Sequence, residues 1–299
     1  MIEVRFMTKL ILSVIFSVFT LKADASINPL FGPGNDFFER YKELLVDIRT
    51  QRLTPEAAKA EFQDIMRLLR ENYPNHIPET EIDNIVFPLV GSNLNAVGGY
   101  GRGFYVRNFN LFDYSVNGSH PAHDIFIYDP NQDCIDDRKN EFIDIVSVGH
   151  GVVLATEKAW SDTSSYRGGN YVWVYDFERG GLWYYAHHRK VVVEPGDIVK
   201  PGDKLGEVGR TGFNAKQPRS DTHLHLMYLA LDEEFTPVPK NFYSWLQNAK
   251  TISKSNSADQ DEFRIFKAGS YEFLKAITFD KIYSSRKIKA FKPLKMKKV

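Results

Sequence analysis

Apolar residues recur with helical spacing near the start of the chain. They lie three or four positions apart over residues 37–48 and again over residues 58–69. This spacing places them along one side of a helix. Thr54 and Pro55 precede the second set and form a helix start signal. The pattern predicts two helices over about residues 35–73, packed on the main body as an antiparallel hairpin.

From about residue 85 the pattern changes to short runs of β-branched and aromatic residues between glycine turns. Residues 171–175 (YVWVY) and 182–187 (LWYYAH) predict two strands joined as a hairpin. Residues 205–209 and 223–229 predict further short strands. Many short strands at close spacing favour a compact antiparallel or barrel-like sheet. We therefore expect a mainly β fold with an N-terminal helical hairpin and a mixed, partly helical C-terminal extension.

The first 25 residues have the pattern of an export signal. Arg5 and Lys9 precede an apolar run over residues 10–21, and Ala23-Asp24-Ala25 follows. A transmembrane helix needs about 20 apolar residues, so this run is too short to span a bilayer. The pattern predicts a signal peptide over residues 1–25 and an exported protein, most simply periplasmic, with secretion, surface association or an uncleaved anchor as alternatives.

Composition narrows the possible partners and cofactors. Lys and Arg number 38 and Asp and Glu also 38, so the net charge argues against a nucleic-acid partner. Cys134 is the only cysteine, which excludes an internal disulfide and a cysteine-based zinc site. The oligomeric state is left open by the sequence.

Histidines and one aspartate supply the candidate metal chemistry. The motifs are HPAHD (residues 120–124), His187-His188 and the His-x-His pair at 223 and 225. Without thiolates, zinc is held by imidazole nitrogens and carboxylate oxygens. Residues two apart on a strand point to the same face, so a His-x-His pair can reach one ion.

The order of these motifs resembles a known family. HPAHD, then YAHHRKVVVEPGDIVKPGDKLGEVGRTG (residues 185–212), then THLHL (residues 222–226) resemble the lysostaphin-type endopeptidases, also called the LytM domain. The resemblance covers roughly residues 87–230. It implies that His120, Asp124 and His225 bind one Zn²⁺ and that His187 and His223 form a catalytic pair. Which histidine of that pair is the general base stays open.

The same resemblance implies a function. We expect a zinc-dependent endopeptidase that hydrolyses peptide bonds in peptidoglycan cross-bridges, so that peptidoglycan peptides are its partners. The alternative is a catalytically inactive LytM-fold regulator that binds and activates another cell-wall hydrolase. The sequence does not distinguish D-alanyl from glycyl bonds, nor does it tell whether the helical hairpin gates the site.

Several residues near the motifs depart from the family pattern or lack a role. His123 could compete as a ligand, but we predict a residue at the rim of the site. His188 should point away from His187 by strand alternation. In the acidic stretch over residues 129–144 we expect a groove-side loop, with Asp136 and Asp137 solvated.

The domain organisation expected from these patterns has four parts. They are a signal peptide (residues 1–25), the helical hairpin region (26–84), the zinc peptidase domain (85–240) and a C-terminal extension (241–299). The last part of the extension, residues 286–298, contains seven basic residues and no acidic residue. This basic tail is either a solvated end or a weak contact with anionic wall polymer or membrane.

Overall fold

A computed structural model describes residues 36–73, 85–164, 166–253 and 266–267 of the 299-residue chain. The predicted signal peptide, the basic tail and most of the C-terminal extension lie outside these residues. Within the described ranges, no helix has both the length and the apolar character that a membrane span requires.

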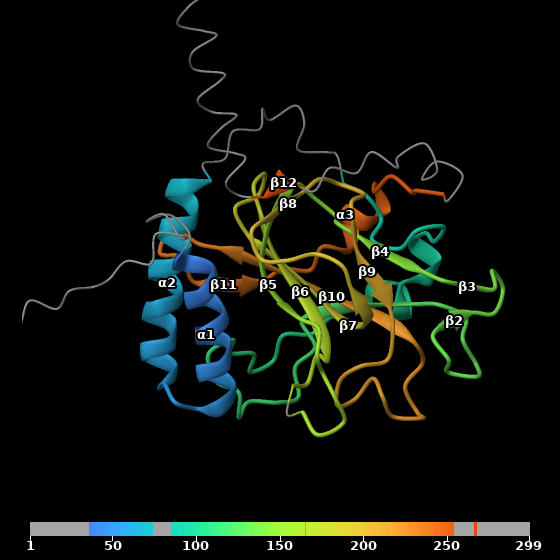
Figure 1. Cartoon of the computed structure of the whole chain (residues 1–299), viewed down its shortest axis with the longest axis horizontal. Coiled ribbons are helices and arrows are strands. Elements are labelled where there is room, and N and C mark those ends of the chain that lie inside the picture. Colours follow the sequence, from blue (N-terminus) through green and yellow to red (C-terminus); the bar gives the residue numbers. More distant parts are fainter. Residues whose placement is uncertain (1–35, 74–84, 165, 254–265, 268–299) are drawn as a thin grey trace, which may run out of the picture.

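The two predicted N-terminal helices are confirmed. Helix α1 (Asp36–Thr50) and helix α2 (Pro55–Asn72) lie side by side as a hairpin (Figure 1). The Thr54 hydroxyl accepts a hydrogen bond from the Ala57 amide at 3.3 Å, which satisfies a free backbone donor at the start of α2. Arg40 of α1 contacts Glu61 of α2 at 2.9 Å and so links the two helices.

Strands are the main regular elements of the remaining described structure, as the sequence predicts. In chain order the elements are η2 (Leu94–Ala96), η3 (Gly98–Gly101), β1 (Ala122–Phe126), β2 (Ile135–Asp136), β3 (Glu141–Phe142), β4 (Asp144–Val146), β5 (Gly151–Glu157), β6 (Asn170–Asp176), β7 (Leu182–Val191), β8 (Asp197–Val199), β9 (Lys204–Val208), β10 (His223–Leu231), β11 (Pro237–Pro239), α3 (Tyr243–Gln247) and β12 (Phe266–Lys267). The main sheet has the order β1-β10-β7-β6-β5-β8-β12, with β11 beside β10 and β9 between β4 and β7. The strand pairs among these elements are antiparallel.

Strand β7 changes its partner partway along its length. Residues 182–186 pair with β10, and residues 188–191 pair with β9. Between the two segments, His187 has a positive φ of 67° and the register with β6 shifts. The register with β9 shifts just after, between His188 and Lys190. These are the features of a β-bulge, which bends a strand and redirects its side chains.

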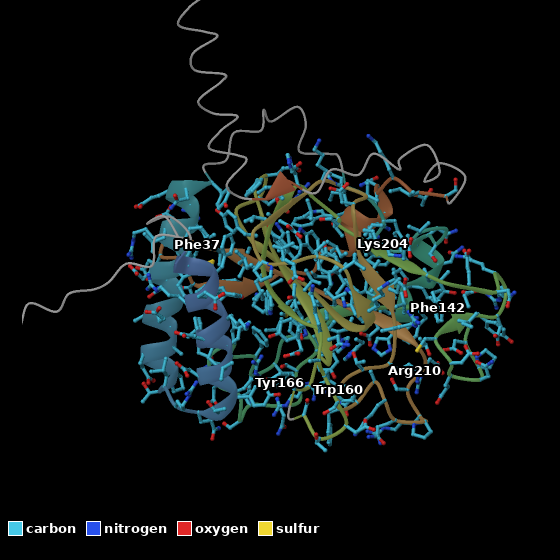
Figure 2. All side chains as sticks on the ribbon, in the orientation of Figure 1. Phe37, Phe142, Trp160, Tyr166, Lys204 and Arg210 are labelled. Atoms are coloured by element: carbon cyan, nitrogen blue, oxygen red, sulfur yellow. The ribbon has the colours of Figure 1, made fainter. Side chains whose placement is uncertain are left out.

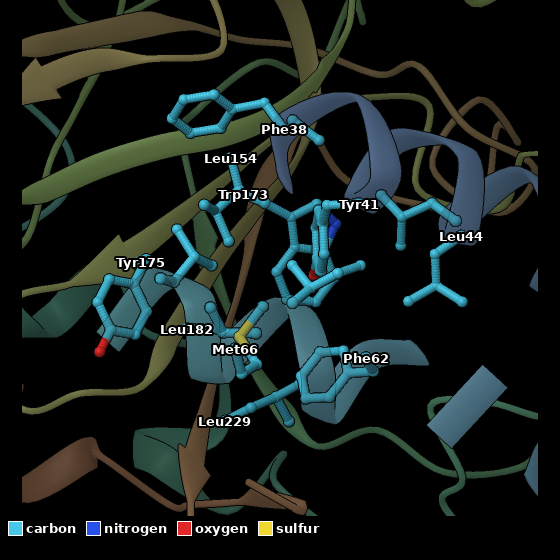
Figure 3. Packing of buried hydrophobic residues seen from close by; sticks show 14 of the residues in the cluster. Phe38, Tyr41, Leu44, Phe62, Met66, Leu154, Trp173, Tyr175, Leu182 and Leu229 are labelled. Carbon is cyan, nitrogen blue, oxygen red and sulfur yellow. The ribbon is translucent and has the colours of Figure 1, made fainter. Parts of the chain in front are cut away.

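The helical hairpin and one face of the sheet share a hydrophobic core. Figure 3 shows Tyr41, Phe62 and Met66 of the helices against Trp173 and Leu229 of the strands. The rings of Tyr41 and Trp173 meet edge to face with centroids 6.1 Å apart. A second core on the other face of the sheet contains Trp183, Tyr185 and Leu226, among others. The hairpin is therefore part of the packed body.

The acidic stretch differs from its expected form. It contains a short hairpin of β2 and β3, whose strands pair at Ile135 and Phe142. Asp136 is only 6% exposed, and its carboxylate accepts hydrogen bonds from the amides of Tyr128 and Lys139. The expectation that Asp136 is solvated is wrong, because its side chain closes the turn between the two strands. Asp137 is exposed, as expected.

Phe62 tests whether the helices and the sheet unfold together. Its ring is 1% exposed and lies 5.4 Å from the Phe112 ring and 6.2 Å from the Tyr41 ring, centroid to centroid. Phe62→Ala should lower the free energy of unfolding by about 3–5 kcal/mol because it leaves a cavity. Glu71→Ala, at an exposed position of the same helix, should change it by less than about 0.5 kcal/mol. Urea unfolding measures both, and a loss below about 1 kcal/mol for Phe62→Ala would contradict the shared core.

Candidate metal centre

Neighbouring strands bring together the three residues expected to bind metal. Asp124 of β1 lies directly opposite His225 of β10 in the strand register, so both side chains project from the same face. His120 precedes β1 and is held by two backbone hydrogen bonds with Tyr105, each 2.9 Å long. One potential ligand atom from each of His120, Asp124 and His225 lies within 4.8 Å of the others.

The carboxylate of Asp124 is the centre of this group. Its oxygens lie 3.2 Å from His120 Nε2, 3.0 Å from His225 Nδ1 and 3.6 Å from His223 Nε2. Burial alone would raise the pKa of Asp124, but the His120 and His225 rings beside the carboxylate outweigh burial and hold the pKa below its ordinary range. The carboxylate is therefore ionised and available as a ligand.

The orientation of His120 supports a cation at this position. Its Nδ1 lies 2.9 Å from the Gly103 carbonyl oxygen, which can only accept a hydrogen bond. In the neutral ring the hydrogen is therefore on Nδ1, and Nε2 presents a lone pair to the Asp124 carboxylate. Two facing lone pairs repel each other unless a proton or a metal ion lies between them. The separations of 3.0 and 3.2 Å are close to the roughly 3.3 Å expected between two ligands of a tetrahedral zinc ion. The donor set thus fits zinc.

His187 and His223 lie beside this donor set. Ala186 is opposite His225, so regular alternation would point His187 to the other face of the sheet. The bulge at His187 reverses this direction. The ring centroid of His187 lies 4.9 Å from that of His223 and 5.6 Å from that of His225.

Both of these histidines are oriented by backbone carbonyl groups. Nδ1 of His187 donates to the Thr211 carbonyl at 2.8 Å, and Nδ1 of His223 donates to the Asp221 carbonyl at 2.7 Å. Each ring therefore keeps the lone pair of Nε2 free to accept a proton. Burial, reinforced by the neighbouring histidines, lowers the pKa of His187 well below its ordinary value. Burial also lowers the pKa of His223, so both rings are neutral near pH 7.

Gly212 is a supporting position that the sequence motifs did not single out. Its φ of +108° is in the region that favours glycine, and an added Cβ would lie 2.5 Å from the Arg167 carbonyl oxygen and 2.9 Å from His187 Nδ1. A larger residue would therefore push against the ring that Thr211 orients. The signal available in the sequence was its place in the GRTG segment of the family pattern.

A second support fixes the segment that carries His223. The Thr222 hydroxyl donates to the buried Asp129 carboxylate at 2.6 Å. Arg210 donates to the Ser220 carbonyl at 2.6 Å and to the Thr222 hydroxyl at 3.1 Å. In Figure 2, Arg210 lies on the side of the molecule away from the helical hairpin. No pattern in the sequence connects Asp129 with Thr222, 93 positions later.

The two adjacent histidines, His123 and His188, lie away from the ligand group. His123 is 1% exposed, and its Nε2 pairs with the Asn241 side chain at 3.0 Å. The expectation of a rim position is therefore wrong, because strand alternation buries this ring against Phe242. His188 is fully buried, and neither ring nitrogen has a hydrogen-bond partner within the described residues.

The fold and these side chains together define a β-sheet domain with a histidine–carboxylate group that could hold a metal ion and two further histidines beside it. Residues 132–237 match the model of Peptidase family M23. The chain therefore carries a peptidase family M23 domain, and the family predicted from the motifs is confirmed. The match includes His187, His223 and His225. His120 and Asp124 precede it and reach the site through the pairing of β1 with β10.

Three of the solved structures that are similar to the chain differ in identity, coverage and TM-score. A Ruminococcus gnavus protein, provisionally assigned as the glycyl-glycine endopeptidase LytM, is 20% identical over 67% of this chain and 75% of its own, with a TM-score of 0.39. The catalytic domain of the antimicrobial peptidase lysostaphin from Staphylococcus simulans is 25% identical over 52% of this chain and 95% of its own, with a TM-score of 0.33. A chain of the SpoIIQ–SpoIIIAH pore-forming complex is 16% identical over 59% and 97%, with a TM-score of 0.37. No curated protein matches the chain.

His223 and His225 allow a test that separates metal ligands from their neighbours. His225→Ala removes one member of the three-residue group, so we expect it to lose zinc and the stability linked to zinc. His223→Ala leaves all three members in place and should retain zinc. The zinc content of each purified variant, with its thermal midpoint with and without chelator, measures the difference. A zinc-free His223→Ala beside a zinc-loaded His225→Ala would mean that the two roles are reversed.

His188 should make stability depend on pH. Burial lowers the pKa of this ring to about 3, whereas an exposed histidine titrates near 6.5. The unfolded state therefore binds the extra proton first, and folded-state stability falls as the pH drops from about 6.5 toward 3. Between about pH 7.5 and pH 5, wild type should lose about 2 kcal/mol more of its unfolding free energy than His188→Phe, which keeps a ring but cannot titrate. Equal losses in urea unfolding at the two pH values would contradict a neutral buried His188.

Proposed function

We propose that this chain is a zinc-dependent endopeptidase that hydrolyses peptide bonds in peptidoglycan cross-bridges. The observation that carries the proposal is the pairing of a metal donor set with two neutral imidazoles. His120, Asp124 and His225 form the donor set, and His187 and His223 each present a free Nε2 beside it. A regulator that only binds another protein needs neither feature.

The residues divide the chemistry between them. His120 Nε2, a carboxylate oxygen of Asp124 and His225 Nδ1 would hold the zinc ion. When bound, zinc supplies Lewis-acid chemistry: it polarises a carbonyl group and makes water more acidic. Nε2 of His187 or of His223 can take a proton from the attacking water and return it to the leaving amine, because burial keeps both rings neutral. Once it holds the water's proton, that same Nε2–H can donate a hydrogen bond to the developing oxyanion before the proton passes to the leaving amine. The other neutral ring can accept a hydrogen bond from the attacking water at its Nε2 and so orient it.

The first residues support a proposal for where the chain acts. We propose that the chain is exported and works in the periplasm, a proposal supported by the signal-peptide pattern of residues 1–25. Peptidoglycan peptides are within reach there. The basic segment over residues 286–298 is proposed to hold the protein weakly on anionic wall polymer or membrane.

Digestion of purified sacculi tests the proposed activity. Zinc-loaded wild type should release muropeptides whose masses identify the broken bond. His187→Ala and His223→Ala should keep zinc but lose roughly 10²–10⁴-fold in rate, because each removes a proton-transfer or oxyanion partner. His150→Ala, a histidine outside the site, is the matched control and should keep the wild-type rate. Equal rates for all four proteins would overturn the catalytic pair, and no release by zinc-loaded wild type would favour the regulator.

A further inference from the structure

A cavity of about 260 Å³ lies between the metal centre and helix α1. One part of its wall is His225 and Met227 of β10, and another part is Leu45, Ile48 and Arg49 of α1. The N-terminal hairpin thus builds part of the space that adjoins a predicted metal ligand. A group bound in this cavity would be next to the site of proposed peptide hydrolysis.

Arg49 is the unusual residue of this wall. Nη1 of its guanidinium group donates to the Tyr171 hydroxyl at 3.0 Å, and the group stacks 3.8 Å above the centre of the Tyr166 ring. Nε is buried and has no hydrogen-bond partner within the described part of the chain. No carboxylate among the described residues pairs with this guanidinium. An arginine has five N–H donors, and among the described residues one of those of Arg49 has a hydrogen-bond acceptor.

The charged side chains that line the cavity have a net positive charge. Its lining contains two arginines, Arg49 and Arg167, and one carboxylate, that of Asp113. Arg167 is held in place by hydrogen bonds to the carbonyls of Val116 and Tyr114. The Asp113 carboxylate accepts hydrogen bonds from the amide and the hydroxyl of Ser115, which lowers the pKa of this acid. Two cations therefore face one anion that is already engaged locally.

The rest of the wall is apolar and aromatic. Tyr166, Tyr171, Trp173 and Tyr184 line it together with the aliphatic side chains of α1. In Figure 2, Tyr166 lies near the end of α1, between the hairpin and the strands. A partly buried guanidinium in such surroundings binds a carboxylate strongly, since the interaction is weakly screened and can use two parallel N–H donors.

We propose that Arg49 is a specificity residue that binds a carboxylate of the substrate peptide in this cavity. The inference rests on the proposed function and narrows it. A glycine bridge carries no side-chain carboxylate, whereas stem peptides joined by direct cross-links carry free carboxylates close to the scissile bond. The cavity therefore favours direct cross-links between acidic stem peptides over glycine bridges.

The test compares two forms of one substrate. A directly cross-linked stem-peptide dimer with free carboxylates is used beside the same dimer with its carboxylates amidated. Wild type should cleave the free form with a kcat/KM roughly ten- to a hundred-fold higher, as expected for a charged hydrogen bond. Arg49→Gln should lose this preference, so that its kcat/KM for the free form falls to its kcat/KM for the amidated form. Arg49→Lys should keep part of the preference, because it keeps the charge but not the planar donor pair.

Arg52→Gln is the matched control, since Arg52 follows the same helix and pairs with Asp47 at the surface. It should leave the preference unchanged. Thermal unfolding of each variant shows that the fold is retained. No difference between the two dimers in wild type, or a full preference in folded Arg49→Gln, would overturn the assignment.

A binding measurement separates this inference from the proposed activity. Calorimetry with the zinc-loaded His223→Ala protein follows binding of the free and amidated dimers without turnover. Tighter binding of the free form that disappears with Arg49→Gln supports the carboxylate site even if wild type cleaves nothing, in which case the proposed peptidase fails alone. Cleavage by wild type without any Arg49-dependent preference has the opposite meaning: the peptidase stands and the carboxylate site fails.

Discussion

The change of partner in strand β7 determines the arrangement of the whole site. Before His187 the strand belongs with β10, and after it the strand belongs with β9. The bulge at this transition turns His187 onto the face that carries Asp124 and His225. A non-glycine residue with a positive φ is strained, and such strain persists only where the surroundings enforce it. Here the Thr211 carbonyl and the close approach of Gly212 provide that enforcement.

Sequence patterns were sufficient for the two helices, the mainly β fold and the family, but not for the β2–β3 hairpin or for the direction of every side chain. Helical spacing predicted α1 and α2, and glycine-separated strands predicted the mainly β fold. Motif order identified the family and grouped His120, Asp124 and His225, which the structure places together. The direction of His187 could not be derived, because period-two alternation predicts the opposite face from its neighbour Ala186.

The predictions that Asp136 is solvated and that His123 lies at the rim of the site were wrong for related reasons. A run of acidic residues suggests solvent exposure, yet a carboxylate that accepts backbone amides in a tight turn becomes buried. His123 adjoins a metal-site residue in sequence, but the strand sends its side chain to the opposite face, where Asn241 pairs with it. Both outcomes depend on contacts with distant segments. The same holds for the cavity beside α1, because no local pattern connects a helix near residue 49 with a strand near residue 225.

The position of the predicted metal ligands in the sheet also affects how the chain is held together. Asp124 and His225 are separated by 101 positions in the chain. Among the described strands, Asp124 lies on β1, at one end of the sheet order, and His225 lies on the adjacent strand β10. An ion bound by both would close a long loop in the same way as a covalent cross-link, which restricts the unfolded chain. The sequence has a single cysteine, so the metal would act as the cross-link that a disulfide forms in other proteins. Catalysis and retention of the edge strand would then depend on the same ion.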